Sequence, residues 1–162
     1  MKAILGSNLS LGSIAKIEVS PFARADLEHL LVMVDDDMQM EALSSTNYLK
    51  SIITAELPMD LEKKGEQSYQ GRLCVRFMAF GNGMLRALHD RSHGFFRRQI
   101  ILSTLPKDPR REDDPELGDK LIAEKDAICM WCYYGLCRLM ENNFRFPISP
   151  QAAANLLKAE SE

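Results

Sequence analysis

The sequence predicts an α/β fold, and three stretches support that prediction. The first, Leu30–Asp37, is a run of five apolar residues followed by three aspartates. The second, Leu73–Phe80, is also mostly apolar and is followed by Gly-Asn-Gly at positions 81–83. Apolar runs of this length are typical of strands covered on both faces, as in a parallel sheet between helices. The third, Glu116–Asn142, repeats apolar residues at helical spacing and predicts one long amphipathic helix.

The start of the chain predicts short elements. Lys2–Leu5 fits the end of a helix that stops at Gly6, because glycine commonly follows the last helical residue. Gly12–Val19 alternates weakly between apolar and polar residues, which predicts a short strand. Ser20 and Pro21 predict a helix start, with serine as the N-cap and proline at the first helical position.

Further elements are expected after the acidic strand. A helix is expected to open at Ser44 and Ser45, and a short helix is expected over residues 84–88. Phe95–Ser103 is predicted to be a third strand of the sheet. Ser149 and Pro150 repeat the serine-proline pattern and predict a last helix, which runs to about residue 158. The expected organisation is an α/β body over 1–105, a charged linker over 106–115 and a helical lobe over 116–162.

Leu57–Arg72 predicts a β-hairpin, with two extended arms about a tip formed by Lys63, Lys64 and Gly65. Two interpretations of the lysines stay open. Lysines are common at exposed tips and edges, so the hairpin can be a solvated loop. The same two side chains can instead carry positive charge to a nucleic-acid backbone.

Charge, apolar runs and cysteine content limit the classes of protein to which this sequence can belong. The 162 residues carry a net charge of −3, so that any contact with nucleic acid must be local. No apolar run approaches the ~20 residues that cross a bilayer, and the start lacks the apolar core of a secretory signal. We therefore expect a cytoplasmic protein that does not bind membranes. The four cysteines are expected to be reduced, and Cys129 and Cys132 to be buried thiols on an apolar helix face rather than metal ligands.

Charged residues at the predicted strand ends suggest a site. Asp35 and Asp36 would repel each other unless a cation lies between them, and Mg²⁺ favours one or two carboxylates together with phosphate oxygens. The alternative is a strand that leaves the core into a solvated acidic turn. Arg97 and Arg98 open the predicted third strand, where at least one of them would need an anion. That anion can be a carboxylate of the fold or a phosphate.

Taken in order, these motifs resemble the superfamily-three helicase domain of phage and plasmid primase–helicases. Val34–Asp37 matches the Walker B position, and Asn47–Gly65 matches the extra motif that includes the DNA-contacting hairpin. Val75–Asn82 matches the strand with the sensor asparagine, and Asp90–Leu102 matches the arginine-finger segment. The resemblance implies a partial AAA+-like P-loop NTPase core with a β-hairpin insertion, in a phage- or prophage-encoded protein of bacterial DNA replication.

The resemblance also implies roles for individual residues. Asp35 would hold Mg²⁺ through water, and Asp36 would orient or deprotonate the attacking water. Asn82 would sense the γ-phosphate of ATP. Arg97, or failing that Arg98, would reach the nucleotide of a neighbouring subunit, which is why the family works as homo-oligomeric rings, usually hexamers.

The hairpin lysines have an implied role as well. Lys63 and Lys64 would grip single-stranded DNA in the central channel of the ring, through phosphate contacts that are non-specific and sensitive to salt.

One feature of the family is missing from these residues. The chain contains no GxxxxGK(S/T) phosphate loop, which in the family lies upstream of the residues that match Met1–Leu5. We therefore expect a helicase domain that begins after its Walker A strand and loop, with very low ATP affinity and hydrolysis on its own. The intact family uses Mg²⁺ and ATP, and this chain alone need bind neither. The alternative is a non-catalytic module for single-stranded DNA binding or ring assembly, as in a prophage remnant.

Overall fold

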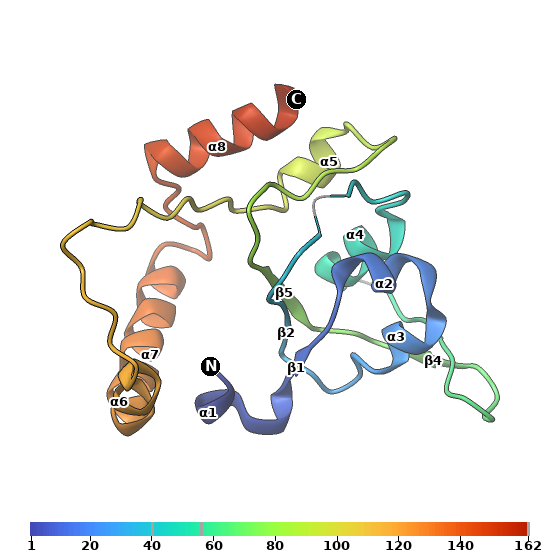
Figure 1. Cartoon of the computed structure of the whole chain (residues 1–162). Coiled ribbons are helices and arrows are strands. Elements are labelled where there is room, and N and C mark those ends of the chain that lie inside the picture. Colours follow the sequence, from blue (N-terminus) through green and yellow to red (C-terminus); the bar gives the residue numbers. More distant parts are fainter. Residues whose placement is uncertain (40, 56, 162) are drawn as a thin grey trace.

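The computed structural model describes residues 1–39, 41–55 and 57–161 (Figure 1). Its centre is a three-stranded parallel sheet with the order β1-β2-β5. The strands are β1 (Leu9–Leu11), β2 (Val32–Asp35) and β5 (Arg76–Ala79). Helices accompany this sheet, so the predicted α/β class is confirmed at this level. The crossover from β2 to β5 includes a helix and a separate hairpin.

β2 is the middle strand, as expected for the most apolar run. Met33, Val34 and Asp35 are all buried. Met33 lies opposite Ser10 on one side and Phe77 on the other. β2 follows a turn at His29, where φ is 67°, and pairs in parallel with β5 from Val32 opposite Arg76 to Asp35 opposite Ala79. The carboxyl end of β2 therefore lies next to the carboxyl end of β5.

The predicted strand over Gly12–Val19 is wrong. β1 ends at Leu11, and the following residues form the helix α2 (Ile14–Val19). Ile14 and Ile17 are both buried, because a spacing of three residues places them on one helical face. The carboxylate of Asp35 also accepts a hydrogen bond from the Ile14 N–H at 2.8 Å, at the start of this helix.

The other predicted elements of the first half are present. α1 (Lys2–Leu5) precedes Gly6, where φ is 55°, and a short 3-10 helix, η1 (Gly6–Asn8), follows. α3 (Pro21–Ala25) has Ser20 as its N-cap. The helix expected from Ser44 begins slightly later, as α4 (Asn47–Thr54). The hairpin consists of the antiparallel strands β3 (Met59–Leu61) and β4 (Tyr69–Gly71).

Two predictions for residues 84–103 are wrong. Residues 84–88 form no helix, and Leu43 instead bridges to Ala87. The expected third strand is replaced by the helix α5 (His93–Phe96) and an irregular segment after it. Phe95 and Phe96 are both buried, whereas consecutive residues of a strand point to opposite faces. Helical backbone lets both rings enter one core, where their centroids are 5.3 Å apart.

The C-terminal part differs from the predicted single long helix. Residues 104–116 contain no helix or strand. α6 (Leu117–Ala123) and α7 (Lys125–Glu141) meet at Glu124, and neither helix has a buried residue. α8 (Pro150–Ser161) is the predicted last helix; it packs against α5, and its Ala152 and Ala159 are buried. None of the described helices is long and apolar enough to cross a bilayer.

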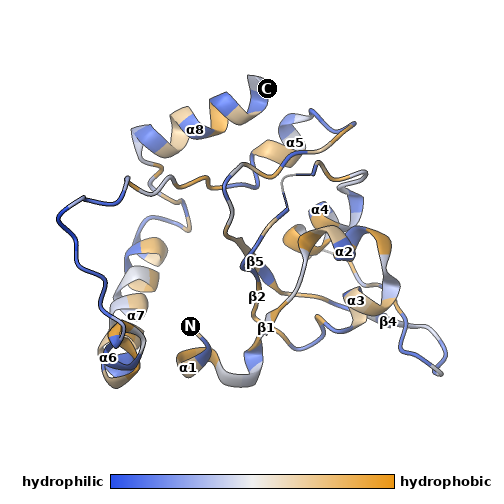
Figure 2. Ribbon diagram, viewed as in Figure 1, coloured by the Kyte–Doolittle hydropathy of each residue, from blue (hydrophilic) through white to orange (hydrophobic). Residues whose placement is uncertain are grey.

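The hydrophobic core lies between the sheet, α2 to α5 and the hairpin, and Figure 2 shows apolar residues along these elements. Ile52, Leu61 and Val75 have no exposed surface. Leu61 of the hairpin belongs to the same cluster as Ile52 of α4. The base of the hairpin is therefore fixed to the body, while its tip projects from it (Figure 1).

Candidate functional site

The predicted acidic residues and the predicted asparagine lie at the same edge of the sheet. Phe80 donates its backbone N–H to the Asp35 carbonyl at 2.8 Å, and Met38 donates to the Phe80 carbonyl at 2.9 Å. The chain segments that leave β2 and β5 therefore stay paired beyond the strands. Asp36 and Asn82 follow in these two segments and are exposed. Parallel strands bring such residues together at the edge where open α/β sheets bind ligands.

Asp35 has a structural role at this edge. Its side chain is buried, and one carboxylate oxygen caps α2 through the Ile14 N–H. Glu18, which is also buried, does the same for α4 by accepting the Leu49 N–H at 2.7 Å. Sequence reasoning did not identify Glu18, because a lone acidic residue in a predicted strand carries no capping signal.

The fit to a metal ion depends on Asp36 and the free oxygen of Asp35. Carboxylates are the donor type that Mg²⁺ prefers, and Mg²⁺ commonly completes its shell with water and phosphate. Among the described residues, no three His, Cys, Asp or Glu side chains gather where they could hold a metal. A Mg²⁺ ion at Asp36 would therefore need a phosphate ligand beside the protein oxygens.

The first hairpin lysine, Lys63, is tied to the body by an ion pair, and 46% of its side chain is exposed. Its Nζ lies 3.0 Å from Oε2 of Glu28, in the turn after α3, and the Tyr69 hydroxyl donates to the same oxygen at 2.6 Å. The bonds from Tyr69 and then Lys63 lower the pKa of Glu28. Tyr69 and Glu28 in turn raise the pKa of Lys63. These three side chains, which we call the hairpin anchor, tie the hairpin to the body.

The second lysine differs from the first in its charged neighbours, although both are exposed. Lys64 is exposed and forms no ion pair within the described residues. Gly65 follows at φ 81°, a left-handed conformation that favours glycine at the turn. Glu62 and Glu66 are exposed on either side of the lysines. The tip therefore presents one available ammonium between carboxylates.

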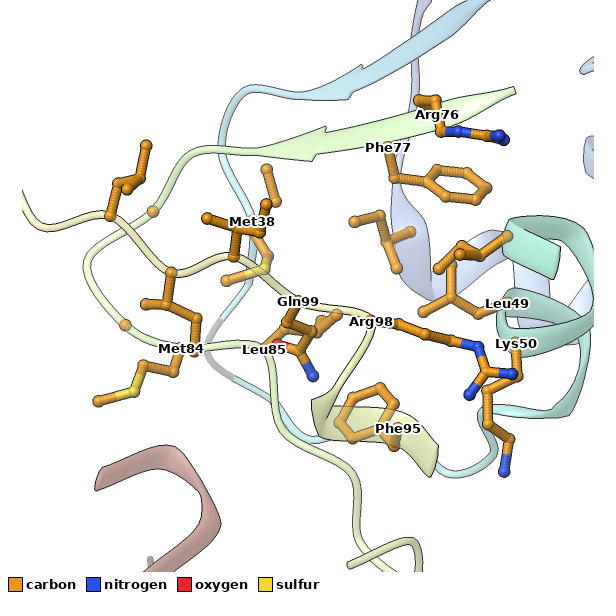
Figure 3. A pocket seen from close by; sticks show the side chains of 18 residues that line it. Met38, Leu49, Lys50, Arg76, Phe77, Met84, Leu85, Phe95, Arg98 and Gln99 are labelled. Atoms are coloured by element: carbon orange, nitrogen blue, oxygen red, sulfur yellow. The ribbon is translucent and has the colours of Figure 1, made fainter. Parts of the chain in front are cut away.

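The two arginines have different surroundings. Arg97 is exposed at the end of α5. Arg98 is half-buried and donates from Nη1 to the Gly94 carbonyl. Because the expected strand is absent, neither arginine lies on the sheet. Arg98 faces a cavity of about 280 Å³ beside β5, which we call the β5 groove (Figure 3).

A polar cluster at Asp90 was not identified from the sequence. Asp90 lies 2.6 Å from the Lys50 Nζ, accepts from the Thr46 hydroxyl, and accepts from both the N–H and the hydroxyl of Ser92. These partners, led by Lys50, lower the pKa of Asp90 well below its usual range. The cluster ties α4 to the loop before α5. The Asp-x-Ser order at 90–92 is a turn pattern that would have found part of it.

The cysteine prediction is wrong. Cys129 and Cys132 are exposed on α7, not buried. α7 contacts α1 and α6, but these contacts bury none of its residues, so a helical spacing of apolar residues did not produce burial.

Comparison with protein families gives one match. The family described as "Family of unknown function (DUF5906)" matches residues 1–98. No curated protein matches the chain. The matched residues include the sheet, the hairpin anchor, the Asp90 cluster and α5, and they make up more than half of the 162 residues. The chain therefore belongs to the DUF5906 family.

Proposed function

We propose that this chain contacts single-stranded DNA as a helicase-related module of DNA replication. The observation that carries the proposal is the hairpin β3–β4, whose anchor leaves Lys64 exposed at a fixed tip. A lysine held in this way is a point charge for a phosphate group. The anchor matters because a preorganised contact loses less conformational entropy on binding.

The arrangement of the sheet supports the same proposal. The hairpin is inserted between β2, which ends at Asp35 and is followed by Asp36, and its parallel neighbour β5, which is followed by Asn82. This order is similar to the motif order of the superfamily-three helicases, and the proposal includes a partial AAA+-like core. ATP hydrolysis is outside the proposal for residues 1–162 alone, because they contain no GxxxxGK(S/T) loop to hold the β- and γ-phosphates.

The charges at the tip indicate how strong the contact is. Glu62 and Glu66 oppose the attraction of Lys64 for phosphate, so one chain binds DNA weakly and with a shallow salt dependence. Several tips in a homo-oligomeric ring would engage one strand together and raise the effective affinity without new contacts. The proposal therefore includes self-association, as in the rings of the helicase family.

Fluorescence anisotropy with a labelled thymidine oligonucleotide at two salt concentrations tests this function. We expect Lys64→Ala to weaken binding at low salt and to flatten the salt dependence. Lys107→Ala is the matched control, because it removes the same charge from an exposed ion pair with Asp113, far from the hairpin in sequence. Equal binding by the wild type and Lys64→Ala, or no binding by either, would overturn the proposal.

A second variant separates charge from positioning. Glu28→Gln leaves Lys64 unchanged and removes the charge that holds Lys63 in the hairpin anchor. If the anchor positions the tip, Glu28→Gln weakens DNA binding although it makes the net charge less negative. Stronger binding would instead show that only the local charge matters and that the anchor does not contribute.

A further inference from the structure

The outer edge of β5 is open for hydrogen bonding. Arg76 donates its N–H to the Leu31 carbonyl, and Phe80 donates to the Asp35 carbonyl, both at 2.8 Å on the β2 side. Alternate residues of a strand bond to opposite neighbours, so Phe77 and Ala79 direct their N–H and C=O groups away from β2. Within the described residues the sheet ends at β5, and no strand pairs with this side.

The β5 groove lies along this open edge. Arg76, Phe77 and Ala79 line it from the strand, and residues 98–102 line it from the other side. Apolar side chains form much of its wall, among them Leu49 from α4 and Phe95 from α5 (Figure 3). A strand-length edge of free peptide groups beside apolar walls suits an extended peptide, which pairs by its backbone and inserts alternate side chains.

The groove also has an electrostatic preference. Its lining includes Lys50, Arg76 and Arg98 and no acidic side chain. The Nε of Arg98 and the Nε2 of Gln99 are buried and have no hydrogen-bond partner among the described residues. Lys50 is already paired with Asp90, whereas the guanidinium of Arg98 donates to the Gly94 carbonyl and has no ion pair among the described residues. Buried donors without acceptors are costly, so an occupant that brings a carboxylate is favoured.

A second copy of this chain does not meet that requirement through its own open sheet edges. The other outer strand of the sheet, β1, reads Leu-Ser-Leu, and β5 reads Arg-Phe-Met-Ala. Neither strand carries a carboxylate. Pairing two copies through β5 would also bring the Arg76 side chains of both copies into one interface.

We propose that the β5 groove binds an extended strand of a different protein chain. Its backbone pairs with Phe77 and Ala79, apolar residues of the strand alternate into the groove, and one acidic side chain pairs with Arg98. This interaction is independent of the DNA contact proposed for Lys64, which lies on the hairpin and not in the groove.

The test uses a capped nine-residue peptide of alternating valine and threonine with one central glutamate. Hydrogen exchange followed by NMR should show slower exchange at the Phe77 and Ala79 amides when the peptide is added. The Arg76 amide, already bonded to the Leu31 carbonyl, should change little. The absence of binding, or protection elsewhere without protection at Phe77 and Ala79, would overturn the proposal.

Changes in the peptide and in the protein test the charge pair with Arg98 and the backbone pairing separately. A peptide with glutamine in place of glutamate should bind the wild type at least about tenfold more weakly, since a charge-assisted bond is lost. Arg98→Met should bind both peptides equally weakly. Ala79→Pro removes an outward N–H and no bond to β2, so it should weaken both peptides. Equal binding of the two peptides by the wild type would contradict the role of Arg98.

Sedimentation of the protein without peptide separates the two kinds of occupant. We expect Ala79→Pro to leave the oligomeric state unchanged. If the wild type self-associates and Ala79→Pro abolishes that association, the edge belongs to a second copy and the proposed occupant is wrong.

Discussion

The α/β body over residues 1–101 and the C-terminal arm over residues 104–148 use apolar residues in different ways. In the body, apolar side chains from the sheet, the hairpin and α2 to α5 form one buried cluster. In the arm, α6 and α7 have no buried residue, and Trp131 is 70% exposed. Figure 2 shows apolar residues in both regions, but those of the body include buried side chains, whereas Trp131, Tyr133 and Tyr134 of α7 are exposed.

The difference shows that apolar spacing leads to burial only where a second layer lies against the helix. In α4, Leu49 and Ile52 share one face and are buried in the core cluster that includes Met33 of β2. In α7 the apolar residues occur on several faces, and aromatic side chains such as Tyr133 and Tyr134 remain more than half exposed. A helix that is apolar all round requires cover on more than one side. α7 packs against α1 and α6, and these contacts leave it without a buried residue.

Removing one aromatic side chain from each region should give the largest difference in the free energy of unfolding. Phe95→Ala deletes a ring that is 2% exposed and should lower the free energy of unfolding by about 3–5 kcal/mol. Trp131→Ala deletes a larger ring but should change the free energy of unfolding by less than about 0.5 kcal/mol. Urea denaturation followed by circular dichroism measures both.

Ile52→Val serves as a milder core variant if Phe95→Ala does not fold, with an expected loss of about 1 kcal/mol. A loss for Trp131→Ala as large as that for Ile52→Val would mean that α7 is packed in solution. The contrast between body and arm would then be wrong.

The second difference is in how much an ion pair of similar length stabilises the body and the arm. Lys50 and Asp90 lie 2.6 Å apart in the body, and Lys107 and Asp113 lie 2.7 Å apart in the arm. Asp90 also accepts bonds from Ser92 and Thr46, so Asp90→Asn should lower the free energy of unfolding by about 2 kcal/mol at neutral pH. Asp113→Asn should have no measurable effect, because the arm pair is exposed.

The pH dependence follows from the lowered pKa of Asp90. A carboxyl whose folded pKa lies below its unfolded value of about 3.9 stabilises the fold at higher pH and loses that contribution on acidification. The gap between the wild type and Asp90→Asn should therefore close as the pH falls through 4 and below. A gap that persists at low pH would show that Asp90 acts through neutral hydrogen bonds rather than through its charge.

Local patterns in the sequence predicted much of the body. The apolar run before Asp35 gave the central strand, and the lysine-glycine tip gave the hairpin. These predictions succeeded because strand burial and turn chemistry act over a few residues. The strand predicted over Phe95–Ser103 failed because the burial of both Phe95 and Phe96 depends on helix α8 and the core, which lie far away in sequence.

The candidate site was predictable in its position but not in its contacts. Sequence reasoning placed Asp35, Asp36 and Asn82 at strand ends, and the structure has them at one edge of the sheet. It could not foresee that Asp35 caps α2 or that Glu28 holds Lys63, because these partners are 21 and 35 residues apart. Their roles in nucleotide and DNA binding remain predictions.

Two helix caps with the same serine-proline pattern should give the smallest difference in stability between the regions. Ser20 accepts the Ala23 N–H at 3.3 Å at the start of α3, and Ser149 accepts the Ala152 N–H at 3.2 Å at the start of α8. Each substitution by alanine should cost about 1 kcal/mol of local helix stability. α3 is tied to the body through Arg24, whose guanidinium bonds to the Ile17 carbonyl and lies over the Tyr48 ring.

Ser20→Ala should therefore lower the urea midpoint of the whole protein. α8 contacts the body mainly through α5 and through Asn155, which donates to the Ile101 carbonyl. Ser149→Ala should leave the midpoint unchanged and speed hydrogen exchange in the first turns of α8, because part of a structure can open without global unfolding. If Ser149→Ala lowers the midpoint as much as Ser20→Ala, α8 unfolds together with the body. The part of the chain that can open separately from the core would then end before α8, within the arm.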